Sequence, residues 1–246
     1  MSLKKDNFSP KDKFFMGLAL NLARERIGLT GSNPSVGCII VKKNKIISFG
    51  QTSYNGRPHA EYNAIKNCSS NLEGSSIYIS LEPCNHHGKT PPCTNEIIKS
   101  KIKKVYYAID DIDKRTSNKS YAILKNKKIK VKKNLLLNEA TKIYKSYVFT
   151  KKNKYPYTIG KIACSKDFFT DTYKKNITNV FSRNFSHLLR YKNQGILISS
   201  KTVNVDNSKL TCRLSGLEKF SPKRFILDKN LNIKMSSYLI KSAKKN

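Results

Sequence analysis

The sequence is poor in acidic residues, has no tryptophan and contains no long apolar run. Its 246 residues include 16 Asp and Glu against 48 Lys and Arg, a formal net charge of 48 − 16 = +32. No stretch approaches the ~18 consecutive apolar residues of a membrane-spanning helix, so we expect no such helix. Residues 1–15 lack the apolar core of a secretory signal. These absences argue against a membrane-spanning or secreted protein.

Cysteine is too sparse and too scattered for a disulfide scaffold. Six cysteines in a chain of this length indicate a reduced, cytoplasmic protein. The length predicts one or two domains of roughly 100–200 residues each. Apolar residues make up only 38% of the chain, but 10% is aromatic, which argues against disorder.

The positive charge has two interpretations. Phosphate neutralisation by Lys and Arg drives nucleic-acid binding, so a charge of +32 is compatible with such a partner. However, only eight of the 48 basic residues are Arg, and lysines are spread over the whole chain rather than gathered in one segment. We favour a compositional bias and do not expect a nucleic-acid partner. In either case a positive field attracts phosphorylated substrates.

The first 150 residues alternate helices and strands, which is typical of an α/β domain with a covered sheet. Apolar spacing predicts helices at 11–27, 58–67, 94–100, 121–125 and 135–149. Strands are predicted at 36–41, 46–49, 77–81, 104–109 and 129–132, the first two as a hairpin. On the first helix the residues at helical spacing are Phe14, Leu18, Leu22 and Ala23.

A lysine-rich segment, 150–154, predicts a boundary between two domains, 1–150 and 151–246. The second domain is predicted to be another α/β unit. It is expected to contain strands at 158–163, 195–199 and 224–228 and a helix at 179–191.

His59, Cys84 and Cys93 offer one imidazole and two thiolates. Zinc binds such N and S ligands, and a catalytic zinc site keeps its fourth position open for water. Glu61 follows His59 by two residues at a predicted helix start, near such a metal without binding it. His-x-Glu followed by Pro-Cys and a second Cys is the signature of zinc deaminases, in which the Glu is the general acid and base. The pattern therefore predicts Zn²⁺ and hydrolytic deamination.

Each of these residues taken alone has a simpler interpretation. A single His is more often structural or exposed than a ligand, and a single Cys is usually a small buried hydrophobe. A Glu in a first helical turn is favoured by the helix dipole. The combination and its order favour zinc.

Eight residues separate Cys84 from Cys93, whereas nucleic-acid and nucleoside deaminases usually have two. The segment 83–93, PCNHHGKTPPC, resembles the P-C-x-H-x-G-x-T-P-P-C loop of the bifunctional riboflavin-biosynthesis deaminase/reductase family. The upstream segment 33–37, NPSVG, is similar to that family's substrate-facing segment. The resemblance implies a cytidine-deaminase-like three-layer α/β/α domain followed by a partial dihydrofolate-reductase-like α/β domain.

The resemblance also implies a substrate, a diaminopyrimidinone with a phosphoribosylamino arm that is deaminated to a uracil derivative. Asn33 would contact the base, and His86, Lys89 and Thr90 would line the phosphoribosyl side. At the position two residues after Gly50, where the family usually has His, this chain has Thr52. This departure is expected to weaken ground-state binding. The family tends to associate, so a homo-oligomer is also consistent with the resemblance.

The segment 155–246 resembles the start of the partner reductase, which uses NADPH. Its implied substrate-facing residues are Lys174, Arg190, Leu210 and Arg213, and its implied cofactor-facing residues are Ala163, Asn176, Thr202 and Asp206. The family's Gly, Trp and Ser appear here as Phe168, Asn176 and Lys229. The chain is also expected to stop before the family's glycine-rich cofactor-phosphate segment. We therefore expect reductase activity to be absent or very weak.

Two other functions are compatible with parts of the sequence. The first is a tRNA or nucleoside deaminase, which only the net charge supports, and the cysteine spacing opposes it. The second is a non-catalytic binding protein with structural zinc. A closed structural site has four protein ligands and no use for an adjacent acid, so Glu61 argues against this function.

Overall fold

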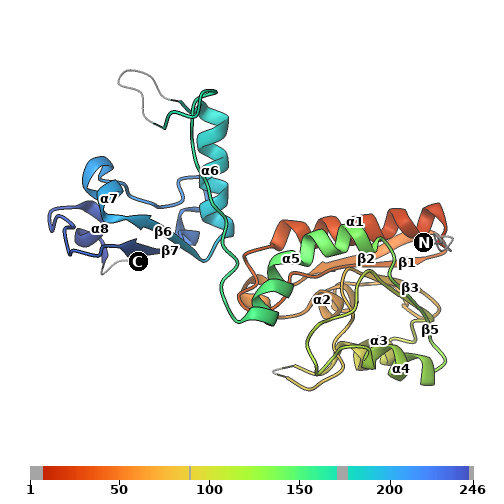
Figure 1. Ribbon diagram of the computed structural model, residues 1–246. Helices are drawn as coiled ribbons and strands as arrows, with labels where there is room; N and C mark the ends of the chain where they lie inside the picture. Colours follow the sequence, from red (N-terminus) through yellow and green to blue (C-terminus); the bar gives the residue numbers. More distant parts are fainter. Residues whose placement is uncertain (1–7, 89, 171–176, 244–246) are drawn as a thin grey trace, which may run out of the picture. The chain divides into compact units, whose positions relative to one another are not determined.

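The computed structural model describes residues 8–88, 90–170 and 177–243, and it divides into two compact units, Met1–Thr158 and Ile159–Asn246 (Figure 1). The sequence predicted a domain boundary in the segment 150–154. In the structure most of this segment belongs to the helix α5 (Leu137–Asn153). No helix in the described ranges has the length and apolar character needed to cross a membrane.

The first unit is built on a five-stranded mixed sheet. Its strands lie in the order β2 (Lys45–Gln51), β1 (Gly37–Lys42), β3 (Ser76–Ile79), β4 (Lys104–Tyr107) and β5 (Lys130–Lys133). β1 is antiparallel to both β2 and β3, whereas β3, β4 and β5 are parallel. The predicted hairpin is present, and its turn residues Lys43 and Asn44 both have positive φ, as a two-residue turn of this kind requires.

Helices cover both faces of this sheet, so the unit has three layers. α1 (Pro10–Arg26) and α5 lie on one face, and the other face is covered by α2 (Ala60–Lys66), α3 (Cys93–Lys99) and α4 (Lys119–Asn126) (Figure 1). A short 3-10 helix, Tyr54–Gly56, precedes α2. The three-layer arrangement agrees with the predicted fold class. Because β3 is buried between helices, Ile77 and Ile79 are fully enclosed.

The sequence spacing identified the buried face of α1 only in part. Ala23 is buried, and Leu18 and Leu22 are half-buried against the core. Phe14 is 60% exposed, and the buried residues are Phe15, Met16, Ala19, Leu20 and Ala23. The helix begins with a capping box between Ser9 and Asp12, and Tyr78 on β3 donates a hydrogen bond of 2.7 Å to the Asp12 carboxylate. This contact with β3 helps to fix the rotation of the helix, which apolar spacing alone did not determine.

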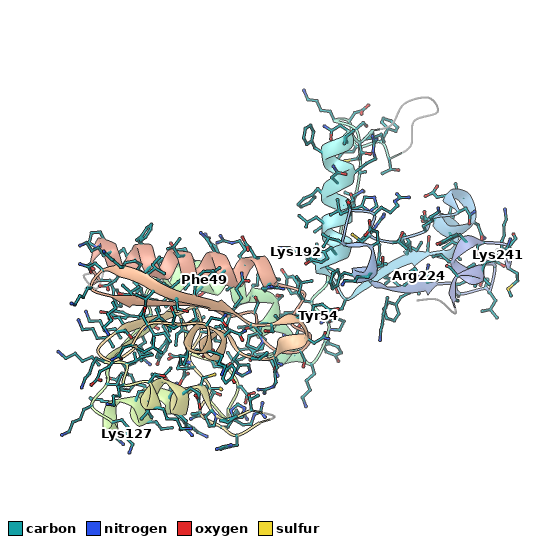
Figure 2. All side chains as sticks on the ribbon, turned by 180° about the vertical axis from the view of Figure 1, so that it is seen from behind. Phe49, Tyr54, Lys127, Lys192, Arg224 and Lys241 are labelled. Atoms are coloured by element: carbon teal, nitrogen blue, oxygen red, sulfur yellow. The ribbon has the colours of Figure 1, made fainter. Side chains whose placement is uncertain are left out.

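Basic side chains often stand at the ends of helices. Lys127 is the C-cap of α4, Lys192 ends α6 (Val180–Lys192) and Lys241 ends α8 (Tyr238–Lys241) (Figure 2). A cation at a helix C-terminus interacts favourably with the helix dipole. The surface also exposes isolated apolar side chains such as Phe49, which is 61% exposed.

Close packing of α2 on β2 depends on Gly50. A Cβ atom at this position would lie 2.2 Å from the Ala60 carbonyl oxygen and 2.6 Å from the Ala64 nitrogen. We expect Gly50→Ala to displace α2 and to lower the free energy of unfolding by at least about 1–3 kcal/mol. Since α2 begins beside His59, zinc affinity should fall as well.

Gly17→Ala is the matched control for this prediction, because nothing lies within 4 Å of the added atom in the middle of α1. It should raise stability by roughly 0.5–1 kcal/mol. Urea unfolding followed by circular dichroism measures both variants. Equal stability of Gly50→Ala and the unmodified chain would contradict the packing argument.

The second unit contains a two-stranded parallel sheet of β6 (Gly195–Ser199) and β7 (Lys223–Leu227). Its helices are α6, α7 (Ser200–Asp206), α8 and the 3-10 helix Glu218–Phe220. A small core of Val203, Leu210 and Leu239 packs on one sheet face through Ile196, Ile198 and Ile226. The opposite face exposes Leu197, Phe225 and Leu227 at 66%, 54% and 68%.

One element of the second unit differs from the sequence-based prediction. The segment 158–163 was predicted as a strand but has no regular secondary structure, because it pairs with neither β6 nor β7. Phe168, which stands where the family that this unit resembles has a glycine, has a φ of 67°. The left-handed region costs a residue with a Cβ atom about 1–2 kcal/mol, so this departure places local strain in the loop.

Candidate active site

His59, Cys84 and Cys93 come together where α2 and α3 begin. His59 is the N-cap of α2, Cys84 lies in the loop after β3, and Cys93 is the first residue of α3. The His59 Nδ1 atom is 3.3 Å from Cys93 Sγ and 3.5 Å from Cys84 Sγ. The three ligand atoms all lie within 4.8 Å of one another. One nitrogen and two sulfur donors fit a tetrahedral zinc ion with one open position.

The loop between the two cysteines is held by backbone contacts at its ends. The Cys93 N–H donates to Cys84 Sγ at 3.3 Å, and the Thr94 N–H donates to the Cys84 carbonyl at 3.1 Å. The first N–H groups of a helix lack partners within the helix, so α3 uses them to hold Cys84. The start of one helix thereby sets the distance between both thiols.

Glu61 lies in the first turn of α2 and is 3% exposed. Burial raises the pKa of its carboxyl group to about 7, although positive charge on His59 opposes this rise. A carboxyl group with a pKa near neutrality can both accept and donate a proton at physiological pH. A residue that acts as general acid and base next to the metal site needs this property.

The two thiols have different proton affinities. A hydrogen bond from Cys93 lowers the pKa of Cys84 to about 4, and His59 acts in the same direction. The pKa of Cys93 is raised instead, by its hydrogen bond with Cys84 and by burial. Zinc binding requires both thiols to lose their protons, and the hydrogen bond between the two side chains favours this loss at Cys84.

Asn33 lies beside the segment that leads to His59. Its side-chain amide donates to the Gly56 carbonyl at 3.3 Å, and a Cβ atom on Gly56 would lie 2.3 Å from that amide nitrogen. Gly56 has φ of 89°, so glycine is required there for both reasons. Thr52 is 2% exposed and its hydroxyl accepts the Val36 N–H at 2.9 Å. Thr52 thus supports the backbone that follows Asn33.

The loop residues expected on the phosphoribosyl side have identifiable contacts. His86 Nδ1 lies 3.2 Å from the hydroxyl of Thr116, which is fully buried. Thr90 accepts a hydrogen bond of 2.5 Å from Arg57 Nη1. Lys89 lies outside the described residues. These contacts join the loop to the segment before α2 on one side and to the 110–118 segment on the other.

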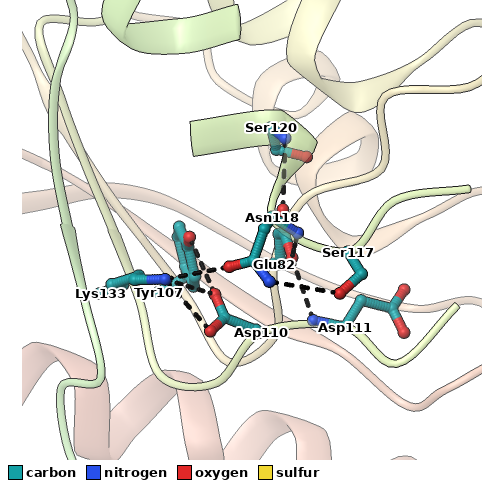
Figure 3. Close-up of polar contacts among 8 residues, drawn as sticks. All are labelled: Glu82, Tyr107, Asp110, Asp111, Ser117, Asn118, Ser120 and Lys133. Atoms are coloured by element: carbon teal, nitrogen blue, oxygen red, sulfur yellow. Dashed lines mark hydrogen bonds and ion pairs between the residues drawn. The ribbon is translucent and has the colours of Figure 1, made fainter. Parts of the chain in front are cut away.

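Glu82 connects the 110–118 segment to the zinc loop, which is the loop between Cys84 and Cys93 (Figure 3). Its carboxylate accepts the backbone N–H groups of Asp111, Asn118 and Ser120 at 3.1, 3.0 and 3.2 Å. Ser120 in turn donates from its hydroxyl to the Pro83 carbonyl at 2.6 Å. Burial raises the pKa of Glu82, and the three N–H donors oppose that rise. Glu82 thereby supports the loop that contains Thr116.

The sites expected in the second unit are only partly assembled. Arg190 and Arg213 gather around buried His187: Arg190 Nη1 is 3.4 Å from His187 Nδ1, and Arg213 Nε is 3.4 Å from His187 Nε2. No carboxylate of the described residues forms an ion pair with either arginine. Burial, Arg190 and Arg213 lower the pKa of His187. Two guanidinium groups near a neutral imidazole are suited to an anion.

The remaining expected residues of this unit are less informative. Leu210 is 5% exposed and belongs to the small core, so its side chain is not available to a ligand. Thr202 lies in the first turn of α7, Asp206 is exposed at its end, and Ala163 is half-buried. Lys174 and Asn176 lie outside the described residues.

Comparison with known proteins assigns the family. Residues 9–109 match the cytidine and deoxycytidylate deaminase zinc-binding region, and residues 156–246 match the RibD C-terminal domain. A solved RibD structure from Acinetobacter baumannii has 31% sequence identity and a TM-score of 0.84, covering 94% of this chain and 67% of its own. The chain belongs to the RibD family. The expected family, the two-part fold class and a zinc-binding region are thereby confirmed.

Several RibD relatives are longer than this chain. The riboflavin biosynthesis protein RibD of Bacillus amyloliquefaciens is 38% identical over 90% of this chain and 60% of its own length. A Thermotoga maritima structure, named a diaminohydroxyphosphoribosylaminopyrimidine deaminase/5-amino-6-(5-phosphoribosylamino)uracil reductase, is 32% identical with a TM-score of 0.76. The match covers 64% of that chain and 89% of this one. The chain thus spans about 60% of the length of these two relatives.

The RibD-like loop also involves residues that the sequence analysis missed. Arg57, Glu82 and Thr116 all contact the zinc loop or its support, but none belongs to the quoted motifs. The sequence offered one indication of Arg57 and Glu82, which is their position close to the predicted zinc ligands. Arg57 stands two residues before His59, and Glu82 stands two residues before Cys84. In the second unit His187 was also missed, although it is one of only four histidines.

Proposed function

We propose that this chain catalyses the hydrolytic deamination of 2,5-diamino-6-(5-phosphoribosylamino)pyrimidin-4-one to 5-amino-6-(5-phosphoribosylamino)uracil in riboflavin biosynthesis. The observation that carries the proposal is the cluster of His59, Cys84 and Cys93 beside the buried carboxyl group of Glu61. The eight-residue spacing of the cysteines and the names of the RibD relatives support this substrate class.

In this proposal His59, Cys84 and Cys93 hold the zinc ion, which when bound lowers the pKa of its water from about 9 towards 7. Glu61 takes a proton from the attacking water. The water oxygen forms a bond to the amidine carbon, and the bond from that carbon to the exocyclic nitrogen breaks. Glu61 returns the proton to the departing amine, which leaves as ammonia. The enclosure of Glu61 keeps bulk water from competing for that proton.

The substrate side of the site is assigned to Asn33, His86, Lys89 and Thr90. Asn33 stands near the entrance of α2 and offers an amide, which both donates and accepts, to the pyrimidine base. His86 and Thr90 lie in the loop between the cysteines, on the side assigned to the phosphoribosyl arm. The substrate is the partner proposed for this chain, and its phosphate suits a net charge of +32.

The test is release of ammonia from the phosphoribosylamino diaminopyrimidinone by the zinc-loaded chain. Absorbance measurements monitor formation of the uracil derivative. Prior chelation of zinc should abolish turnover, and added zinc should restore it. A folded, zinc-loaded chain without turnover would refute the proposal. Deamination of cytidine or of tRNA in its place would favour the alternative deaminases.

We further propose that the second unit contributes little or no NADPH-dependent reduction in this chain. The support is local: Phe168 occupies a left-handed position that suits glycine, and the described sheet of this unit has two strands. Oxidation of NADPH with the uracil product should be undetectable next to deamination. An ordinary turnover would show that the unit is an active reductase. The free thiols of the six cysteines are consistent with the cytoplasm as the proposed location.

A further inference from the structure

Arg57 places a guanidinium group on the loop between the two cysteines. Its Nη1 atom donates to Thr90 Oγ1 at 2.5 Å. A Cβ atom added to Gly88 would lie 3.0 Å from its Nη2 atom, so the group also lies against the backbone of that loop. Arg57 itself is half-buried and directly precedes Pro58 and His59. The side chain therefore contacts the loop that contains residues assigned to the substrate arm, and it comes from a position two residues before the proposed ligand His59.

The charge of this guanidinium is not neutralised by the described residues. No carboxylate among them forms an ion pair with Arg57, and its only hydrogen bond to them is the one to Thr90. A guanidinium has five N–H donors in a planar fork, so most of its donors are available. The neighbouring loop offers no competing acid, because residues 85–92 contain neither Asp nor Glu.

We propose that Arg57 binds the phosphate of the substrate and sets the preference for the phosphorylated over the dephosphorylated pyrimidine. This inference rests on the proposed function. A planar guanidinium pairs with two phosphate oxygens at once, and the hydrogen bond from Nη1 to Thr90 helps to hold it in place. The half-buried position limits competition from water and strengthens the pairing.

A purely structural role for Arg57 makes a different prediction. If the side chain only braces Thr90 and Gly88, its loss disturbs the loop for every substrate equally. If it binds phosphate, its loss matters only when the substrate has a phosphate. Comparison of the phosphoribosylamino substrate with its dephosphorylated ribosylamino form separates the two roles.

The experiment measures kcat and KM for both substrates with the unmodified chain, Arg57→Ala and Arg57→Lys. Arg24→Ala, on the exposed surface of α1, removes one positive charge elsewhere and serves as the control. Arg57→Ala should lower kcat/KM for the phosphorylated substrate roughly 10- to 100-fold, mainly through KM, and leave the dephosphorylated substrate nearly unchanged. Arg57→Lys should recover part of the loss, and Arg24→Ala should match the unmodified chain.

Equal losses for both substrates, or no loss for either, would overturn the assignment. Zinc content shows whether each variant keeps an intact site. If the unmodified chain deaminates neither substrate, the proposed function fails by itself, and calorimetry with ribose 5-phosphate and ribose then decides the role of Arg57. Tighter binding of the phosphate form that disappears in Arg57→Ala supports the assignment, and no difference between the two sugars overturns it.

Discussion

Glu61→Gln is expected to reduce kcat for deamination by about 10²- to 10⁴-fold while zinc stays bound. Glutamine keeps the size and polarity of the side chain but cannot accept the proton of the attacking water. Glu61 is 3% exposed, so no solvent molecule easily takes over this task. Ammonia release under substrate saturation gives kcat, and metal analysis of the same sample gives the zinc content.

Retained zinc is the decisive part of this result, because it separates proton transfer from metal binding. Glu25→Gln, on the exposed surface of α1, is the matched control and should behave like the unmodified chain. Loss of zinc from Glu61→Gln would instead show that the carboxylate helps to hold the metal. Wild-type turnover by the zinc-loaded variant would assign the proton shuttle to another group.

The metal cluster was accessible from sequence because its ligands lie at element boundaries with strong local signals. His59 and Cys93 each stand beside a helix start marked by proline, and Cys84 follows a strongly apolar strand. Such boundaries depend on residues near in sequence. The second unit gave weaker signals: its segment 158–163 is apolar enough to resemble a strand, yet it has no partner strand in the described fold.

Contacts between distant segments were not predictable in this way. Arg57 and Thr90 are 33 residues apart, and Glu82 reaches the backbone of Ser120 across 38 residues. These pairs meet only after the strands have aligned in the sheet. The face of α1 has a similar cause, because a neighbouring strand contributes the Tyr78 hydroxyl that binds Asp12 and helps to fix its rotation. Local periodicity contains no information about such partners.

Cys84→Ser is expected to weaken zinc binding by more than about 100-fold. Loss of an outer-shell partner of a metal ligand already costs about 10- to 100-fold in affinity, and Cys84 is proposed as a ligand itself. Zinc binds the thiolate form of cysteine, and a serine hydroxyl, which keeps its proton at neutral pH, does not replace it. Competition with a coloured zinc chelator measures the affinity. Cys68→Ser is the control, since the Cys68 thiol donates to the carbonyl groups of Ile47 and Ser70 and is not part of the ligand cluster.

The same variant also tests whether Cys84 acts through the metal alone. A ligand that binds only the folded chain stabilises it in proportion to the logarithm of its concentration over its dissociation constant. Zinc should therefore raise the melting temperature of the unmodified chain and not that of Cys84→Ser, and with excess chelator the two should melt together. A lower melting temperature of Cys84→Ser in chelator would show that the thiol also stabilises the loop, through the N–H that it accepts from Cys93. Unchanged zinc affinity would remove Cys84 from the metal site.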